Sequence, residues 1–216
     1  MPKLNPLKRT AATRDPEATK CQILDAATIE FAVGGLAAAR TESIASKTGV
    51  TKAMIYYYFN SKEELYRAVM QRCFNEDLQL VKQLNLDQLT PPQALVTVIS
   101  NMYQKMCKRP QMASIMALES IQNSGKYYPQ QTAEILFGQL IGLLDRGIAS
   151  GDFRPLESRH TAINIVGSCA FYFIARENIK HLWPGQDLLS VEMVDRQSKE
   201  ATDMILAGVL APGKSV

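Results

Sequence analysis

The chain has 216 residues, of which 46% are hydrophobic, enough to bury a core in one compact domain or in a small domain joined to a larger one. The net charge is +3, but the first 75 residues hold eleven Lys or Arg against seven Asp or Glu, which places +4 there and −1 in the remainder. This asymmetry favours contact between the N-terminal part of the chain and a polyanion. No uninterrupted apolar run approaches the roughly 20 residues that span a bilayer, so we expect a cytoplasmic protein with no membrane partner.

Cysteine and histidine are too scattered to predict a metal site. No C-x-x-C pair occurs, and each cysteine has apolar neighbours, so we expect buried free thiols, with a redox switch as the alternative. The four residues are Cys21, Cys73, Cys107 and Cys169. The two histidines, His160 and His181, have no carboxylate or cysteine at metal-ligand spacing. We therefore expect no metal and no cofactor.

The N-terminal part of the chain is predicted to form a short arm and four helices. Residues 1–14 are polar, basic and Pro-containing, which is typical of a disordered arm. Capping residues and glycines then mark the helix ends. The first predicted helix runs from Asp15 to the Gly34-Gly35 pair, and the second is a helix of about eight residues that ends at Gly49. The third runs from Thr51 to Phe59, and the fourth from Ser61 to about Leu84. We assign residues 15–77 to one N-terminal domain and residues 78–216 to a helical body.

The body is predicted to be helical throughout. Its breaks contain Gly or Pro, and no period-2 strand pattern is present. The expected helices cover about 92–108, 110–122, 129–149, 158–181 and 187–210. The fold class is therefore all-α.

Residues 42–59, E-S-I-A-S-K-T-G-V-T-K-A-M-I-Y-Y-Y-F, have the layout of a helix-turn-helix. Gly49 suits the left-handed conformation of the turn, and Thr51 can cap the second helix. Lys52 and Ala53 then lie at the N-terminal end of that helix, the end that meets base edges in such motifs.

Four consecutive aromatic residues end this motif, and one helix face cannot bury all of them, because each residue turns the helix by 100°. We expect Phe59 and Tyr58 to face the core, and Tyr56 and Tyr57 to face DNA alongside Lys52, since a tyrosine hydroxyl can donate to phosphate. Lys62 adds an anion contact at the N-terminus of the next helix. The alternative is an aromatic cluster that only joins three helices.

Residues from about 17 to 77 resemble the N-terminal domain of the tetracycline-repressor (TetR) family. The resemblance is carried by I-L-D-A-A…F-A-x-G-G-L…I-A…G-V-T-K-A-M-I-Y-Y-Y-F-N-S-K-E-E-L-Y, in which the Gly-Val-Thr turn, the Tyr-Tyr-Phe end and the Ser-Lys-Glu start have the family's offsets. It implies three DNA-binding helices, a connecting fourth helix, and a helical body that binds a small effector. The DNA-contacting positions that it implies are Thr51, Lys52, Ala53, Tyr56, Tyr57 and Lys62, with a phosphate contact from Arg40 or Thr41.

The body offers two further expectations. Its last two helices mix small and apolar residues, which is compatible with packing inside a monomer or with a four-helix homodimer interface, and the family resemblance favours the dimer. Its middle helices are rich in Met, whose flexible side chains can form ordinary core or line an adaptable cavity. The predicted pocket residues, supported by the resemblance, are Met102, Tyr103, Met106, Met112, Met116, Phe137 and Leu140.

The sequence thus indicates a sequence-specific DNA-binding transcriptional regulator, by family habit a repressor released by a small-molecule effector. Its partners would be double-stranded operator DNA, an inverted repeat if the chain dimerises, and an effector whose identity the sequence does not give. Two alternatives remain: a helical enzyme, for which no catalytic triad, metal spacing or phosphate loop is present, and a helix-turn-helix module used only for protein interaction.

Overall fold

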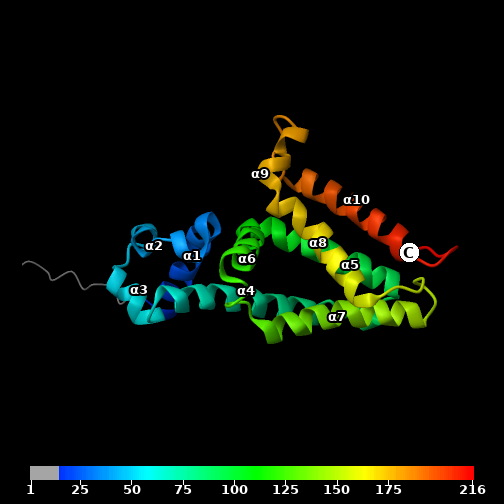
Figure 1. Ribbon diagram of the computed structural model, residues 1–216, viewed down its shortest axis with the longest axis horizontal. Helices are drawn as coiled ribbons and strands as arrows, with labels where there is room; N and C mark the ends of the chain where they lie inside the picture. Colours follow the sequence, from blue (N-terminus) through cyan, green and yellow to red (C-terminus); the bar gives the residue numbers. More distant parts are fainter. Residues whose placement is uncertain (1–14) are drawn as a thin grey trace, which may run out of the picture.

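The computed structural model describes residues 15–216 and is helical, as predicted; the arm expected over residues 1–14 lies outside the described residues. Figure 1 shows an elongated molecule with α1–α3 at one end. Within the described residues the only β-type pairing is an isolated bridge between Phe153 and Leu210. The helices are α1 Pro16–Ala38, α2 Thr41–Thr48, α3 Lys52–Phe59, α4 Lys62–Gln83, α5 Pro91–Lys108, α6 Pro110–Asn123, α7 Gln130–Ala149, α8 Ser158–Ile174, α9 Arg176–Ile179 and α10 Val191–Val209, with short 3₁₀ turns η1 Leu86–Gln88 and η2 Lys180–Leu182.

Three of the first four helices, α1, α3 and α4, begin where the capping residues predict. The side chains of Asp15, Thr51 and Ser61 each accept a hydrogen bond from a backbone N–H in the first turn of α1, α3 and α4 respectively. These bonds satisfy N–H groups that have no partner inside the helix. The Gly34-Gly35 break is also present, because Gly35 leaves helical geometry with φ 70° before one last turn to Ala38.

We call α1–α3 and the first half of α4 the head, and α5–α10 the body. The boundary predicted between residues 77 and 78 falls inside α4, which continues from the head into the body without interruption. Moreover, α1 packs along α6, and the buried cluster around Phe31 includes Ile115 and Tyr127 from the body. The head and the body therefore share a hydrophobic core.

The helix predicted over residues 158–181 is not continuous, because it breaks at Ala175 near its end. α8 ends at Ile174, and the chain continues through the short α9 and η2 before α10 begins at Val191. Tertiary contacts hold this return segment: the Tyr172 hydroxyl donates to the carbonyl of Leu188 at 2.8 Å, and the Cys107 thiol donates to the carbonyl of Leu189 at 3.5 Å. These contacts outweigh the local helix propensity of the segment.

α1 is the one helix of the described chain that is long and apolar enough to span a membrane by length and composition alone. Core helices can pass the same test, and Ile23, Ala27 and Phe31 of α1 are fully buried inside the head. We therefore interpret α1 as the central helix of the head core.

Two glycines of α7 provide a matched test of packing in the body. A Cβ atom at Gly147 would lie 2.0 Å from the ring of Phe153, which is 2% exposed, whereas a Cβ at Gly142 would meet nothing within 4 Å. We expect Gly147→Ala to lower the free energy of unfolding by about 1–3 kcal/mol through overpacking. The control Gly142→Ala should raise it by roughly 0.5–1 kcal/mol, because alanine favours the helix. Urea unfolding of both variants measures these changes, and equal changes in the free energy of unfolding would contradict the packing argument.

Candidate nucleic-acid interface and ligand cavity

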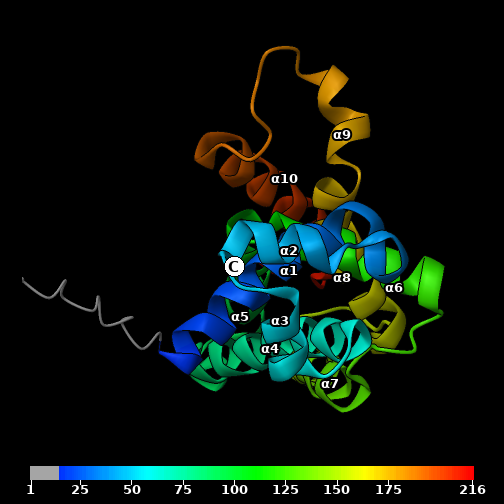
Figure 2. The same ribbon diagram turned by 90° about the vertical axis from the view of Figure 1, so that its left-hand side faces the viewer.

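α2 and α3 form a helix-turn-helix at the end of the head. Gly49 ends α2 in the left-handed conformation with φ 66°, and Thr51 caps α3 two residues later. Ile44 and Ile55 are fully buried and Val50 is 7% exposed, so the turn is closed over a small core. Figure 2 faces this end and shows α2 and α3 in front of the rest of the head. The predicted motif is therefore formed.

Glu30 of α1 fixes the position of α2. Its carboxylate accepts hydrogen bonds from the Ser43 hydroxyl at 2.7 Å, from the Arg40 backbone N–H at 3.2 Å and from the Lys47 ammonium at 3.2 Å. The Ser43 bond, followed by the Arg40 and Lys47 bonds, lowers the pKa of Glu30 despite partial desolvation. Sequence patterns gave no sign of this anchor, because its partners lie 10–17 residues away along the chain.

The four consecutive aromatic rings separate as helix geometry predicts. Phe59 is 5% exposed in the head core, and Tyr58 is half-buried against it. Tyr56 is half-buried with its hydroxyl 3.4 Å from the Thr41 hydroxyl, while Tyr57 is 81% exposed. Tyr57 therefore projects into solvent from the outer face of α3, and Tyr56 connects this face to the start of α2.

The predicted base-reading end of α3 is open to solvent. Thr51, Lys52 and Ala53 are all exposed. The Lys52 ammonium pairs with the Glu42 carboxylate of α2, and it also lies 5.8 Å from the centre of the Tyr56 ring. The hydrogen bond from Lys52 lowers the pKa of Glu42, and the same bond raises the pKa of Lys52. A contact between Lys52 and a nucleic acid would therefore require its ammonium to leave this carboxylate.

A hollow of about 430 Å³ lies between the N-termini of α2 and α4, and Arg40, Thr41, Tyr56 and Lys62 are among the residues that line it. Arg40 is exposed, whereas Thr41 is 4% exposed, so Arg40 is the more accessible of the two residues predicted for a phosphate contact. The Lys62 ammonium donates to the carbonyls of Ala37 and Ala39 at 3.2 Å each. Lys62 thus also ties α4 to the end of α1, a role that the sequence did not indicate.

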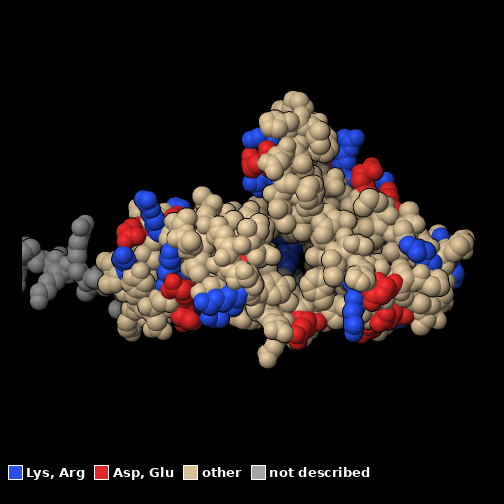
Figure 3. All heavy atoms as spheres, viewed as in Figure 1, with Lys and Arg blue, Asp and Glu red and all other residues tan. Residues whose placement is uncertain are grey.

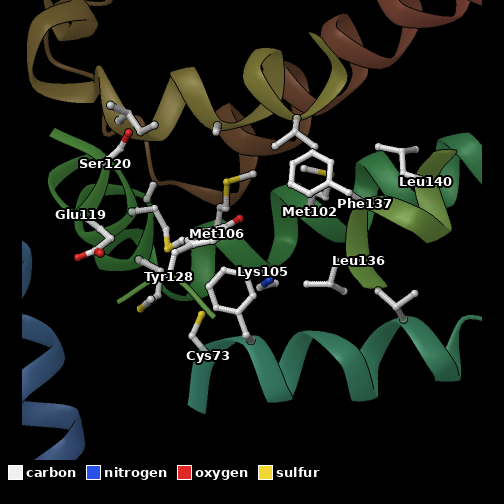
Figure 4. Close-up of a pocket in the computed structure, with 18 of the residues that line it drawn as sticks. Cys73, Met102, Lys105, Met106, Glu119, Ser120, Tyr128, Leu136, Phe137 and Leu140 are labelled. Atoms are coloured by element: carbon white, nitrogen blue, oxygen red, sulfur yellow. The ribbon is translucent and has the colours of Figure 1, made fainter. Parts of the chain in front are cut away.

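A cavity of about 790 Å³ lies in the body, between α4, α5, α6, α7 and α8. Figure 3, in the same view as Figure 1, shows the surface of the body hollowed between α6 and α8, with a basic side chain at the bottom. Six of the seven residues predicted from the Met-rich pattern line this cavity, and Figure 4 labels four of them. They are Met102, Met106, Met112, Met116, Phe137 and Leu140.

Tyr103 does not line the cavity. It is fully buried on the other side of α5, with its ring 5.8 Å from that of Phe173 on α8, and burial raises the pKa of its hydroxyl to about 12. Helix geometry explains the difference, because the cavity is lined from one face of α5 by Val98, Met102 and Lys105, and Tyr103 lies one 100° step beyond Met102, outside that face. The prediction grouped residues by their place in the sequence and did not consider which face of α5 each of them lies on.

The sequence analysis also missed the wall of the cavity that α4 supplies. Cys73, Phe74, Val81 and Leu84 line the cavity from the second half of this helix. A signal was available, because Phe74 and Val81 are seven residues apart and share a helix face beyond the end of the head. The polar lining comes from other helices and includes Lys105, Glu119 and Ser120, which Figure 4 labels together with Tyr128.

Exposed apolar side chains form a second surface on the last helices of the body. On α8, Ile163, Phe171 and Ile174 are 57%, 62% and 46% exposed, and Met204 on α10 is 60% exposed. A Cβ atom at Gly167 of α8 or at Gly208 of α10 would meet nothing within 4 Å. These two helices therefore present apolar residues and open glycines outward, a combination suited to close packing against another helix.

The cysteines only partly match the prediction. Cys73 and Cys169 are buried, and burial raises the pKa of the Cys169 thiol to about 12, but Cys107 is half-buried and Cys21 is exposed on α1. All four are free thiols. In residues 15–216, no group of three or more His, Cys, Asp or Glu side chains converges to hold a metal ion.

Two family models match this chain. The one described as "Bacterial regulatory proteins, tetR family" matches residues 23–69, which include the helix-turn-helix. The one described as "Tetracyclin repressor-like, C-terminal domain" matches residues 91–205, more than half of the chain. Together they cover both the head and the body.

Individual relatives and solved structures agree with these matches. The chain is 28% identical over 197 residues to the HTH-type transcriptional repressor NicS of Pseudomonas putida, covering 89% of this chain and 90% of that protein. It is 28% identical to the HTH-type transcriptional regulator RutR of Escherichia coli over 74% of this chain and 76% of RutR. The fold resembles that of the transcriptional regulator FadR from Bacillus subtilis in complex with stearoyl-CoA, with a TM-score of 0.68 and 23% identity over 87% of this chain and 98% of that one. The protein therefore belongs to the tetR family of bacterial regulatory proteins and is a DNA-binding transcriptional regulator with a helix-turn-helix head.

Proposed function

We propose that the protein is a homodimeric repressor that binds an inverted-repeat operator and releases it when a small molecule enters the cavity of the body. One observation carries this proposal: α4 belongs to both sites. Its N-terminal residue Lys62 lines the hollow beside α2 and α3, and its residues Phe74 and Val81 line the cavity. A ligand that contacts the second half of α4 can therefore bias the position of the head.

The exposed face of α3 is suited to the major groove. Lys52 and Ala53 at its N-terminus would meet base edges, and Tyr57 would meet the sugar-phosphate backbone. The hollow between α2 and α4 would take a phosphate at Arg40 and Lys62, with the positive ends of two helix dipoles offsetting the carboxylates of Glu42 and Glu63, which also line it. In this proposal Thr51 contributes mainly by capping α3. Tyr56 and Thr41 line the hollow, and their hydroxyls lie 3.4 Å apart, so they connect α3 to the start of α2.

The exposed apolar residues of α8 and α10 support a homodimer. Pairing α8 and α10 with the same helices of a second copy would bury Ile163, Phe171 and Met204 in an isologous four-helix interface. Two heads related by a two-fold axis then read an inverted repeat, with half-sites about one helical turn or a multiple of it apart.

The cavity supports an apolar or mixed-polarity effector. Its volume falls within the range of ligand pockets, roughly 300–1,000 Å³, and Met102, Met106 and Phe137 give it a flexible apolar lining. The FadR structure of similar fold is in complex with stearoyl-CoA, which has a long apolar acyl chain, and this supports an effector with an apolar part for this chain. In this proposal the protein needs no cofactor or metal, catalyses no reaction, and acts on DNA in the bacterial cytoplasm.

The two other functions considered from the sequence are a helical enzyme and a helix-turn-helix module that binds only proteins. The repressor relatives and the open, basic end of α3 favour operator binding over both. Duplex DNA binding that weakens steeply with salt separates the regulator from either alternative, because released counterions contribute only when phosphates are contacted.

The first prediction concerns the DNA contacts. Tyr57→Ala should weaken binding to an operator fragment by roughly 5–10-fold, and Lys62→Ala should reduce the slope of log affinity against log salt by about one. Because Lys62 also holds the end of α1, its variant needs a thermal unfolding control, and exposed Lys180 on η2 supplies a matched lysine whose alanine variant should bind normally. Wild-type affinity in both head variants at moderate salt would show that this face does not contact DNA.

The second prediction concerns the dimer. Phe171→Glu places a charge on the exposed apolar face of α8 and should convert the protein to a monomer in sedimentation, with DNA affinity lowered by at least about tenfold. Ile121→Glu, at a residue of α6 that is 78% exposed, is the matched control and should leave a dimer. A wild-type chain that sediments as a monomer at micromolar concentration would remove the basis for an inverted repeat.

The third prediction concerns the effector. Once a screen has identified a compound that releases operator DNA, Met106→Trp and Met116→Trp should each prevent the compound from weakening DNA binding, because the added indole ring fills its site. A tenfold release requires about 1.4 kcal/mol of coupling, and DNA must weaken the compound by the same factor. Leu182→Trp, at an exposed position of η2, controls for the added ring. Normal release in both cavity variants would place the effector elsewhere.

A further inference from the structure

Glu119, near the end of α6, is a buried carboxylate that the DNA-binding function alone does not explain. It is 1% exposed, and its two oxygens accept hydrogen bonds of 2.6 Å each, from the backbone N–H of Tyr127 and from the side-chain amide of Asn123. Figure 4 shows the carboxylate at the margin of the cavity, directed away from its centre. A buried carboxylate is costly unless such donors hold it, so these bonds constrain the groups that make them.

The donors of these bonds belong to the end of α6 and to the connection that follows it. After Asn123 the chain reverses through Ser124 and Gly125, which have φ angles of 53° and 75°. The Gly125 N–H donates to the backbone carbonyl of Glu119 at 3.3 Å, and the Tyr127 N–H donates to its carboxylate. The connection is thus folded back on the last turn of α6, with Glu119 at its centre. We call residues 124–128 the clasp.

The two tyrosines of the clasp contact different parts of the protein. Tyr127 is 8% exposed in the head core, where its ring meets that of Tyr66 on α4 edge-on at 5.5 Å. Tyr66 in turn meets Phe31 of α1 edge-on at 4.9 Å. Burial, followed by the nearby Glu119 carboxylate, raises the pKa of Tyr66. Tyr127 therefore belongs to a row of packed rings that ends on the central helix of the head.

Tyr128 faces the cavity instead. It is among the lining residues, and its ring meets that of Phe74 on α4 edge-on at 5.2 Å. Because Tyr127 and Tyr128 are adjacent in the chain, a displacement of one ring is carried to the other unless the backbone between them is free to rotate. The bond from Glu119 to the Tyr127 N–H limits that rotation.

We propose that Glu119 is a positioning residue that locks the clasp, so that Tyr128 in the cavity wall and Tyr127 in the head core move together and transmit occupancy of the cavity to α1 and α4. The inference rests on the proposed function of the cavity and adds the route by which its occupancy reaches the head. Packed cores shift between discrete arrangements, so a small displacement of Tyr128 can select a different position of the head. Contact alone does not establish such a route, so the coupling between occupancy of the cavity and DNA binding has to be measured.

The test uses a tethered occupant, so it does not depend on the natural effector. The parent is the full-length chain with Met106→Cys in the cavity and with Cys21, Cys73 and Cys107 replaced by serine. Its new thiol is labelled with methyl, butyl or octyl methanethiosulfonate, and mass spectrometry confirms one label. DNA affinity is measured with a duplex enriched from random sequence by the wild-type protein. We expect the octyl label to weaken DNA binding by at least about tenfold and the methyl label to have little effect.

Glu119→Gln in the parent removes the lock while keeping the shape of the side chain. Tyr127 and Asn123 donate to different oxygens of Glu119, and an amide replaces one of these oxygens with an NH₂ group, so the variant loses one of the two bonds. We expect the unlabelled variant to bind DNA nearly as the parent does, and the octyl label to weaken binding by less than about threefold. Glu134→Gln is the matched control, because Glu134 is an exposed carboxylate of α7 that accepts from Gln130. It should retain the full response.

If the octyl label leaves DNA binding of the parent unchanged, the cavity does not communicate with the head, and the proposed release fails together with the clasp. If the label acts equally in the parent and in Glu119→Gln, the clasp alone is overturned and the proposed release stands. If Glu119→Gln does not fold, Asn123→Ala removes one of the two carboxylate bonds, and a full response in that variant overturns the proposal.

Discussion

The contact on which the rest of the structure depends is the packing of the body into the core of the head. The head helices do not close their own hydrophobic core. Ile115 of α6 and Tyr127 after it are buried in the same cluster as Phe31 of α1 and Tyr66 of α4. Burying such large side chains stabilises the junction by several kcal/mol, at roughly 1.5–3 kcal/mol for each side chain. The body as well as the head therefore determines the orientation of α3.

This shared core makes regulation at a distance physically reasonable. A head on a flexible linker would bind DNA whatever happened in the body, whereas this head can change position only if the α1–α6 and α4–α7 contacts rearrange. The cavity lies against the same helices, so an occupant competes directly with the packing that positions the head. In the proposed function, the empty and the occupied cavity would correspond to alternative packings of these helices, between which a ligand selects by its differential affinity.

The charges of the head are mostly engaged in the absence of DNA. Lys52 pairs with Glu42, Lys47 with Glu30, and Lys62 with backbone carbonyls at the end of α1. Exposed pairs of this kind contribute little stability, typically less than about 1 kcal/mol, so they can be exchanged for phosphate at small cost. The pairs also restrict these long side chains in the free protein, so a side chain that exchanges its partner for DNA would lose less conformational entropy.

The sequence by itself determined the all-α fold, the helix-turn-helix and the separation of the four aromatic rings, because these features depend on local chemistry. Capping side chains such as Thr51 and Ser61, a glycine at the left-handed turn, and the 100° step of a helix all act within a few residues. Only the tertiary structure decided that Tyr103 turns away from the cavity, that α4 supplies one of its walls, that α8 stops at Ile174, and that Glu119 and Lys62 are held by groups elsewhere in the fold. Glu30 and Lys62 meet partners 10–25 residues away, and the body completes the head core from still farther along the chain. Such contacts depend on how helices are placed against one another, and local periodicity carries no record of that placement.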